Sequence, residues 1–162
     1  PPPHRLADAL ERFTGADRRF QVMGERAGVV VVDDYAHHPL KISAALQAAR
    51  SRYPERAIWA VWQPHTYTRT QALWDDFTTC FVDADHVLVT PIYAAREQPI
   101  AGVDGAAIAA AIALRHPDAR YVESFDAALN ALYREVRAPA VIILLSAGDA
   151  PRIGRVFLGD GT

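Results

Sequence analysis

Residues 29–39 read VVVVDDYAHHP: four successive valines, two aspartates and, five residues later, a proline that opens a helical pattern. A run that is apolar on both faces is typical of a strand in a parallel sheet that helices cover on both sides. Proline suits the first position of a helix because its φ is fixed and no N–H is needed there. The stretch therefore predicts a buried strand, a polar loop and a helix that begins at Pro39.

The same unit recurs along the chain. Four more short apolar runs are predicted as strands: 57–62, 86–90, 120–122 and 140–145. Between the strands, apolar residues recur at helical spacing, in the sets Ile42, Leu46 and Ala49, then Leu73, Phe77 and Phe81, then Ile108 and Ile112, and finally Phe125, Leu129, Leu132 and Val136, with Ser124 as an N-cap. This alternation predicts an α/β fold, a doubly wound, Rossmann-like and mostly parallel sheet with helices on both faces.

The amino-terminal part departs from this alternation. Residues 19–25 and 29–33 are predicted to pair as a hairpin around Arg26-Ala27-Gly28, which adds one antiparallel edge strand to the sheet. Residues 4–13 are predicted as a short helix within a lead-in segment, 1–15, and residues 16–162 as one domain. Pro1-Pro2-Pro3-His4 resembles neither a signal nor a transit peptide, and we expect it to continue a longer chain.

Composition excludes several classes of protein. The 162 residues are 51% hydrophobic and 22% charged, as in a globular domain. A formal net charge of −2 argues against a nucleic-acid partner, and no apolar run approaches the roughly 20 residues of a membrane helix. The single cysteine, Cys80, cannot form an internal disulfide and is expected to be a core thiol, so a cytoplasmic location is predicted.

Polar residues cluster after three of the predicted strands, where ligands bind in open α/β sheets. The junctions are residues 33–39, residues 63–70 (Gln-Pro-His-Thr-Tyr-Thr-Arg-Thr) and residues 146–149 (Ser-Ala-Gly-Asp). Asp34 has two interpretations: it accepts hydrogen bonds from a ribose diol, or it caps the following helix. The residue 146–149 turn could let the backbone approach a ligand, although one glycine turn is a weak signal.

Arg69 is the most informative residue of the second junction. A cation near a helix N-terminus is disfavoured by the macrodipole, so an arginine there indicates an anionic partner. The partner is either a ligand carboxylate held by the guanidinium or a surface ion pair with Asp75 or Asp76. Arg18 and Arg19 are interpreted as solvated side chains, or as contacts to a phosphate or an adenine.

A metal-dependent hydrolase is the least favoured hypothesis. Asp33, His37, His38 and His65 are possible ligand types, but adjacent histidines diverge and the sequence has no H-x-x-x-H or C-x-x-C pair. We therefore predict no metal site. The sequence also has no G-x-x-x-x-G-K-[ST] and no G-x-G-x-x-G loop, so the chain is not expected to cradle a triphosphate by itself.

Taken together, three ordered motifs resemble the carboxy-terminal domain of the Mur ligases, most closely of the members that act on L-alanine. They are Arg18-Arg19-Phe20-Gln21, Asp33-Asp34-Tyr35-Ala36-His37-His38-Pro39 and residues 63–70; residues 92–100 are also similar to a loop of that family. The resemblance runs from about residue 16 to residue 149. It implies an ATP-dependent ligase that joins L-alanine to UDP-N-acetylmuramate through an acyl phosphate, in peptidoglycan precursor synthesis in the bacterial cytoplasm.

The resemblance also implies roles for single residues. Arg19 and Asp34 would contact ATP, Asp34 at the ribose, while Tyr35, His37, His65 and Arg69 would line the place for alanine and the muramyl group. Amino-terminal and central domains of the same chain would hold the UDP-sugar, the P-loop and the ligands of Mg²⁺, and residues 1–15 would lead in from the central domain. No residue of this fragment is assigned as catalytic, and the fragment alone is expected to be inactive.

The sequence departs from the family pattern at three places. Many relatives have arginine at position 66, Thr-Glu at positions 40–41 and glycine at position 146, where this chain has Thr66, Leu40-Lys41 and Ser146. Two alternatives stay open: the related ligase that recycles murein tripeptide, and a stand-alone, non-catalytic nucleotide-binding module. The Gln-Pro-His start of the second motif favours the alanine-adding members over the recycling ligase.

Overall fold

The computed structural model describes residues 18–160. A six-stranded sheet forms its centre, with strands β1 (Gln21–Arg26), β2 (Val29–Asp34), β3 (Ala57–Trp62), β4 (His86–Val89), β5 (Ala119–Tyr121) and β6 (Ala140–Leu145). The helices are α2 (Pro39–Arg52), α3 (Tyr67–Ala72), α4 (Trp74–Phe77), α5 (Gly105–Ala113), α6 (Phe125–Glu135) and α7 (Pro151–Leu158). Within this part of the chain, no helix has the length and apolar character that crossing a bilayer would take.

The strands lie in the order β1-β2-β6-β3-β4-β5. All neighbouring pairs are parallel except β1 and β2, which form the predicted antiparallel hairpin at one edge. Strand β6 pairs along its full length on both sides: residue 140 lies opposite residues 29 and 57, and residue 145 opposite residues 34 and 62. The last strand of the chain therefore joins the two halves of the sheet.

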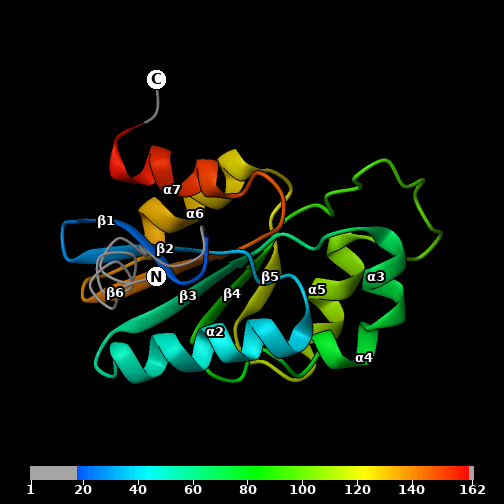
Figure 1. The fold of residues 1–162 in the computed structure, drawn as a ribbon, viewed down its shortest axis with the longest axis horizontal. Coiled ribbons are helices and arrows are strands. Elements are labelled where there is room, and N and C mark those ends of the chain that lie inside the picture. Colours follow the sequence, from blue (N-terminus) through cyan, green and yellow to red (C-terminus); the bar gives the residue numbers. More distant parts are fainter. Residues whose placement is uncertain (1–17, 161–162) are drawn as a thin grey trace, which may run out of the picture.

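Helices cover both faces of the sheet, as predicted (Figure 1). Helices α2, α4 and α5 enclose one core, in which Ile42, Leu46 and Ile108 are fully buried against alternate strand residues. Helices α6 and α7 enclose the other core, with Leu132 and Ile153 at its centre. Because both faces are covered, the central strands are apolar at every position rather than at alternate ones.

Predicted features of three helices are confirmed: the start of α2, the buried face of α5 and the cap of α6. Helix α2 begins at Pro39, α5 carries Ile108 and Ile112 on its buried side, and the Ser124 hydroxyl caps α6 by accepting from the backbone N–H of Ala127 at 3.0 Å. Asp34 does not cap α2, so that interpretation is wrong: the N-cap is His38, which makes no side-chain cap hydrogen bond.

Two helices differ from the prediction. The stripe of Leu73, Phe77 and Phe81 does not lie on one helix, because the chain breaks between α3 and α4 at Leu73 and leaves α4 in a turn before Phe81. All three side chains nevertheless pack into the same core. Helix α7 was not predicted, and the expected lead-in helix over residues 4–13 lies outside the described residues.

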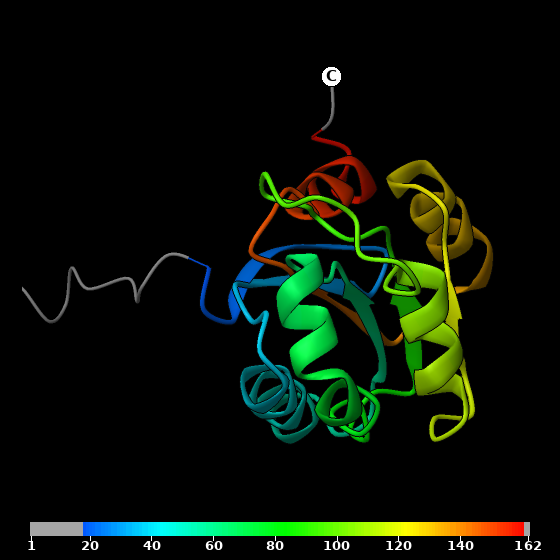
Figure 2. The same cartoon turned by 90° about the vertical axis from the view of Figure 1, so that its right-hand side faces the viewer.

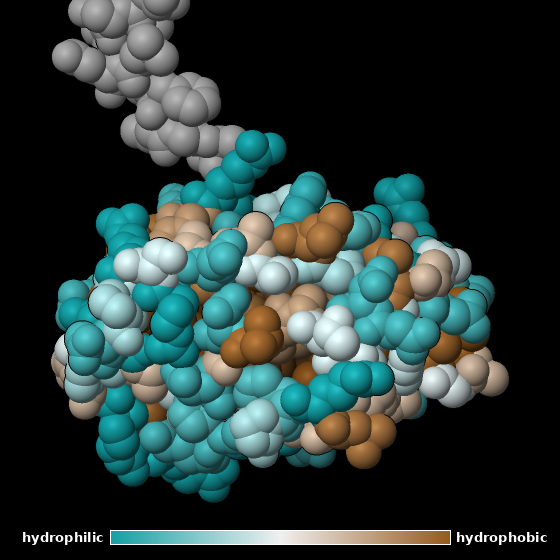
Figure 3. Space-filling view, turned by 90° about the horizontal axis from the view of Figure 1, so that it is seen from below, coloured by the Kyte–Doolittle hydropathy of each residue, from teal (hydrophilic) through white to brown (hydrophobic). Residues whose placement is uncertain are grey.

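The surface on the α2 side mixes hydrophilic residues with scattered hydrophobic ones (Figure 3). Cys80 lies beneath the surface, 6% exposed, and donates to the carbonyl of Phe77, so the prediction of a core thiol is confirmed. Burial raises the pKa of this thiol to about 12.

Candidate functional site

The three polar junctions meet at one edge of the sheet. The loops after β2, β3 and β6 leave the carboxyl ends of three adjacent parallel strands, and α3 lies across this edge (Figure 2). Topology alone brings them together, because residues 34, 62 and 145 are register partners. All six predicted site residues, Arg19, Asp34, Tyr35, His37, His65 and Arg69, lie on or beside these loops.

Asp34 organises the first junction. Its two carboxylate oxygens accept from the backbone N–H groups of Phe20 at 2.7 Å and Ala36 at 2.8 Å, which ties the start of the hairpin to the end of β2. Burial raises the pKa of Asp34 above its ordinary value, and the two N–H donors oppose that shift. The carboxylate is thus held rigidly, with one face toward the hollow described next.

A hollow of about 440 Å³, named here the nucleotide-sized hollow, opens beside Asp34. Its lining combines an aromatic ring, an apolar helix face and charged groups, from Arg19, Phe20, Asp34, Tyr35, Lys41 and three alanines of α2. A flat apolar surface with two cations and one carboxylate at its rim suits a nucleotide, whose base is flat and whose phosphates are anionic. The predicted pair Arg19 and Asp34 is therefore brought together, and Tyr35 joins that pair.

Arg18, rather than Arg19, is the structural arginine of the pair. Its guanidinium contacts the Asp33 carboxylate at 2.9 Å and donates to the backbone carbonyls of Ser146 at 2.6 Å and Gly148 at 3.4 Å. The interpretation of Arg18 as a solvated side chain is wrong, because one side chain ties the first junction to the third. Apart from the two adjacent arginines, nothing in the sequence indicates this role of Arg18.

The same contacts separate Asp33 from the histidines. Alternate residues of a strand point to opposite faces, so Asp33 faces Arg18 and the α7 side while Asp34 faces the hollow next to α2. Within residues 18–160, no three His, Cys, Asp or Glu side chains are grouped so that they could hold a metal ion. The set of Asp33, His37, His38 and His65 proposed for a hydrolase is thus not assembled.

Four aromatic rings form a continuous row along the sheet edge. Ring centroids are 5.0 Å apart between Tyr35 and His37, 5.8 Å between His37 and His65, and 5.5 Å between His65 and Tyr93. The guanidinium of Arg18 lies 5.2 Å from the Tyr35 ring and closes one end of the row. The predicted residues Tyr35, His37 and His65 therefore lie side by side, next to the nucleotide-sized hollow.

Arg69 reaches this row from α3. Its Nη1 lies 2.9 Å from Nδ1 of His65 and 3.4 Å from the His65 carbonyl oxygen. The predicted alternative, an ion pair with Asp75 or Asp76, is not formed; no carboxylate of the described residues lies within ion-pair distance of this guanidinium. A guanidinium that contacts only an imidazole and a backbone carbonyl has its remaining donors available for an anionic ligand.

Thr66 begins α3 in a strained conformation. Its φ is +68°, which a β-branched residue rarely adopts, and its hydroxyl accepts from the backbone N–H of Arg69 at 3.4 Å. The Thr66 N–H donates to the carbonyl of Tyr93 at 2.9 Å, so the turn is held from a neighbouring loop. Strain of this kind concentrates at functional sites, where surrounding contacts maintain it.

The loop between β4 and α5 supplies two residues that the sequence analysis did not select. Tyr93 stacks on His65, and Glu97 accepts from the backbone N–H and the hydroxyl of Thr68 at the start of α3. Residues 92–100 are similar to a loop of the family, but nothing in their spacing indicates which side chains turn toward α3. This loop extends from the sheet edge in Figure 1.

The third junction packs against the second. The Ser146 hydroxyl donates to Oε1 of Gln63 at 2.7 Å, and Nε2 of Gln63 donates to Asp149 at 2.9 Å. A Cβ at Gly148 would lie 2.6 Å from the Gln63 Oε1 and 3.0 Å from the Tyr93 ring. A side chain at position 148 would therefore displace the Gln63 amide and the Tyr93 ring, and Ser146 is accommodated because its hydroxyl accepts from the backbone N–H of Gly148 at 2.8 Å.

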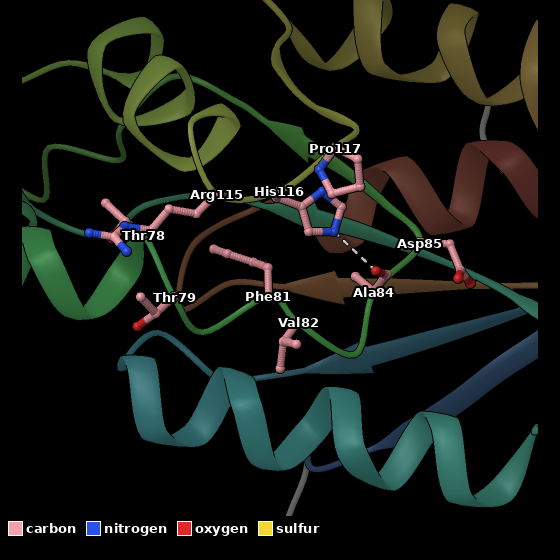
Figure 4. A pocket seen from close by; sticks show the side chains of 9 residues that line it. All are labelled: Thr78, Thr79, Phe81, Val82, Ala84, Asp85, Arg115, His116 and Pro117. Atoms are coloured by element: carbon pink, nitrogen blue, oxygen red, sulfur yellow. Dashed lines mark hydrogen bonds between the residues drawn. The ribbon is translucent and has the colours of Figure 1, made fainter.

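A second hollow, of about 430 Å³, lies at the opposite edge of the sheet, at the amino ends of β4 and β5 (Figure 4). His116 is the only imidazole in its lining and is 7% exposed. Both of its ring nitrogens are used inside the chain, one with the Ala84 carbonyl at 3.0 Å and the other with the backbone N–H of Asp118 at 3.2 Å. His116 is therefore structural, and the first edge remains the candidate site.

Comparison with known proteins gives a consistent result. The pattern of the Mur ligase, glutamate ligase domain matches residues 18–148. The chain is 43% identical over 160 residues to the UDP-N-acetylmuramate–L-alanine ligase of Desulfatibacillum aliphaticivorans; the match covers 98% of this chain and 35% of that protein. The chain thus spans about a third of the length of such relatives.

Solved structures agree on the fold. UDP-N-acetylmuramate-alanine ligase MurC of Thermotoga maritima superimposes with a TM-score of 0.69 at 28% identity, covering 94% of this chain and 31% of that one. A murein peptide ligase of Psychrobacter arcticus gives a TM-score of 0.76 at 23% identity, over 94% of this chain and 32% of the other. With a family pattern that matches 18–148, this chain belongs to the Mur ligase family and carries its glutamate ligase domain.

Proposed function

We propose that the chain is the carboxy-terminal domain of an ATP-dependent ligase that joins L-alanine to UDP-N-acetylmuramate through an acyl-phosphate intermediate. The observation that carries this proposal is the placement of Arg69. Its guanidinium has no carboxylate partner among residues 18–160 and lies beside His65, in the row of aromatic rings whose first member, Tyr35, lines the hollow. A bidentate cation at that place suits the carboxylate of an incoming amino acid.

Each predicted residue has a role in this proposal. Arg19 and Asp34 bind ATP in the hollow, with Asp34 accepting from the ribose hydroxyls. Tyr35, His37 and His65 line the place where the amino acid meets the muramyl group, and Arg69 holds the amino-acid carboxylate. The domain thereby catalyses by positioning, because an oriented amine attacks an adjacent acyl phosphate far faster than a free one.

The remaining parts of the reaction belong to other domains of the same protein. The described residues contain no P-loop, so the triphosphate and the Mg²⁺ bound to it are assigned to a central domain, and the UDP-sugar to an amino-terminal domain. Residues 16–162 form the closing domain in this proposal, and residues 1–15 lead in from the central one. Domain closure excludes the water that would hydrolyse the acyl phosphate, and the reaction takes place in the cytoplasm.

ADP release by the full-length protein, with ATP and UDP-N-acetylmuramate, tests the proposal. We expect turnover with L-alanine and none with murein tripeptide, and we expect the isolated domain to be inactive. Turnover with the tripeptide alone would assign the chain to a recycling ligase and would leave the reaction class intact. No ADP release with either acceptor would favour a stand-alone nucleotide-binding module.

A further inference from the structure

His37 and His65 lie next to each other in the aromatic row, with ring centroids 5.8 Å apart. Each ring commits one nitrogen to a partner inside the chain. Because the two partners differ in chemistry, they fix the protons of the two rings differently.

The proton of His37 is fixed by the backbone. Its Nδ1 lies 2.7 Å from the carbonyl oxygen of Tyr35. A carbonyl oxygen only accepts hydrogen bonds, so Nδ1 must carry the hydrogen. In the neutral ring, Nε2 of His37 is then a lone-pair acceptor.

The proton of His65 is fixed by an arginine. Its Nδ1 lies 2.9 Å from Nη1 of Arg69, and a guanidinium only donates. Nδ1 of His65 must therefore hold the lone pair, and the hydrogen sits on Nε2. The two neighbouring rings have opposite tautomers, and neither Nε2 has a hydrogen-bond partner among the described residues.

Burial, together with the charges around the pair, keeps both rings neutral. Burial lowers the pKa of His37, and the positive charges of Arg69 and Lys41 lower it further, together with neighbouring His38, against the opposing Tyr35 carbonyl. Burial also lowers the pKa of His65, as do Arg69 and His37, while Glu97 acts in the opposite direction. At pH 7 both tautomers are therefore maintained.

We propose that His37 and His65 act as a matched acceptor and donor for amide-bond formation, with Nε2 of His37 taking a proton from the attacking amine and Nε2–H of His65 donating to an oxygen of the acyl phosphate. This inference rests on the proposed function. It assigns His37 as a catalytic base and makes Tyr35 and Arg69 the residues that set the two tautomers.

Amide formation in this proposal transfers one proton and breaks one C–O bond. The neutral amine of the amino acid forms the C–N bond, and its nitrogen becomes acidic, so one N–H proton passes to Nε2 of His37. The bond between the carbonyl carbon and the bridging oxygen of the acyl phosphate then breaks, and the phosphate leaves with the bonding electron pair. The imidazolium of His37, repelled by Arg69, then gives its proton to the phosphate or to water. The products are the amide and hydrogen phosphate.

The tautomers are testable without any substrate. The ¹⁵N chemical shifts and long-range ¹H–¹⁵N couplings of the imidazoles in this chain report which nitrogen carries hydrogen. We expect a protonated Nδ1 in His37 and a protonated Nε2 in His65 at pH 7. The same tautomer in both rings, or a cationic His37 at this pH, would overturn the proposal.

Two asparagine variants of the full-length ligase test the chemistry. An asparagine amide occupies the place of Nδ1, so His37→Asn keeps a donor to Tyr35 and removes the acceptor, while His65→Asn keeps an acceptor for Arg69 and removes the donor. We expect each variant to lower kcat about 100-fold, the usual size of a lost proton-transfer group, with KM for ATP changed less than about twofold. His38→Asn, one residue away, is the matched control and should retain kcat within about twofold.

The pH profile separates catalysis from structure. Wild-type kcat should fall as the pH drops through the pKa of His37, which lies below its ordinary value of 6.5, because protonation removes the lone pair of His37; this limb should be absent in His37→Asn. A His37→Asn enzyme that keeps kcat within about threefold would overturn the inference while the ligase proposal stands. A wild-type enzyme that forms no amide would overturn the proposed function and, with it, the roles of both histidines; the tautomer measurement would then stand as a structural result only.

Discussion

Glu97 caps α3 from a separate loop: one carboxylate oxygen accepts from the backbone N–H of Thr68 at 2.9 Å and the other from the Thr68 hydroxyl at 2.6 Å. Helix α3 has no acidic residue in its own first turn, so the loop provides the negative charge that a helix N-terminus favours. This contact joins the loop that carries Tyr93 to the helix that carries Arg69.

Replacement of Glu97 by alanine should free the first turn of α3. We expect faster hydrogen exchange at the Thr68 amide, because its acceptor is lost, while exchange in β3 should not change. The exposed neighbour Gln98→Ala serves as the control. Equal exchange rates at Thr68 in the wild type and the Glu97→Ala variant would contradict the capping role.

The same contact gives a pH dependence. Hydrogen bonds from Thr68 lower the pKa of Glu97, which means that the contact with α3 stabilises the ionised form of this carboxyl group. A depressed pKa means that the stabilisation is present above the ordinary pKa and is lost as the pH falls through the folded value. Thr68 protection should therefore decrease below about pH 4.5, the ordinary value, and be independent of pH in Glu97→Ala.

Arg18→Ala should destabilise the domain. The Asp33 side chain is 6% exposed and would lose its only cationic partner among the described residues. Breaking a buried pair costs about 3–5 kcal/mol, and because the Arg18 side chain is itself 26% exposed we expect about 2–3 kcal/mol, measured by urea unfolding. Arg19→Ala should leave the free energy of unfolding nearly unchanged; an equal loss there would rule out the ion pair as the cause.

Arg69→Ala, in the full-length protein, should weaken use of the amino acid by about 1.5–3 kcal/mol in kcat/KM, as for a lost hydrogen bond to a charged group. The affinity for ATP should hardly change, because Arg69 is not in the lining of the nucleotide-sized hollow. Steady-state kinetics with each substrate varied in turn would show this. A loss confined to ATP would move Arg69 into the nucleotide site.

Asp34→Asn should act on nucleotide binding and on the pH dependence of stability. Burial raises the pKa of Asp34, so the folded state binds this proton more tightly than the unfolded chain does. The contribution of Asp34 to stability is thus present at low pH and is lost as the pH rises through the folded pKa. Unfolding free energies of the wild type and the variant should diverge over that range, and titration with ATP should show weaker binding by the variant at pH 7.

Cys80 should be unreactive in the folded protein. Its pKa of about 12 and its 6% exposure leave almost no accessible thiolate at pH 8. Ellman's reagent should label no cysteine in the folded chain and one per chain in denaturant. Rapid labelling under folding conditions would contradict the buried position of this thiol.

Much of the fold could be predicted from the sequence. Strands such as 29–34 and 140–145 are apolar at every position, and that pattern requires cover on both faces. The hairpin turn could also be predicted, because glycine readily adopts the positive φ that such turns need; the φ of Gly28 is +78°. Helix α7 was missed because it is short and a glycine, Gly154, stands on its buried side; a Cβ there would lie 2.8 Å from side-chain atoms of Leu144 and Met23, which would have to move.

The site could be predicted only in part. The polar residues that follow β2, β3 and β6 could be predicted as site residues, because the carboxyl ends of parallel strands meet at one edge of the sheet. The direction in which side chains point could not be predicted: Arg18, whose φ is +62°, contacts Asp33 and the Ser146 carbonyl, and Glu97 reaches Thr68 from 29 positions away. Such contacts depend on tertiary geometry that leaves no periodic trace in the sequence.

The position of β6 has a consequence for the order of folding. This strand is the last of the six in the chain, yet it lies between β2 and β3 and is hydrogen-bonded to both along its whole length. During synthesis, a nascent chain that ends before residue 140 holds the β1–β2 hairpin and the β3–β4–β5 unit without the strand that connects them. The two halves of the sheet therefore join only after residues 140–145 have left the ribosome, and the edge that gathers the candidate site is completed at that same moment.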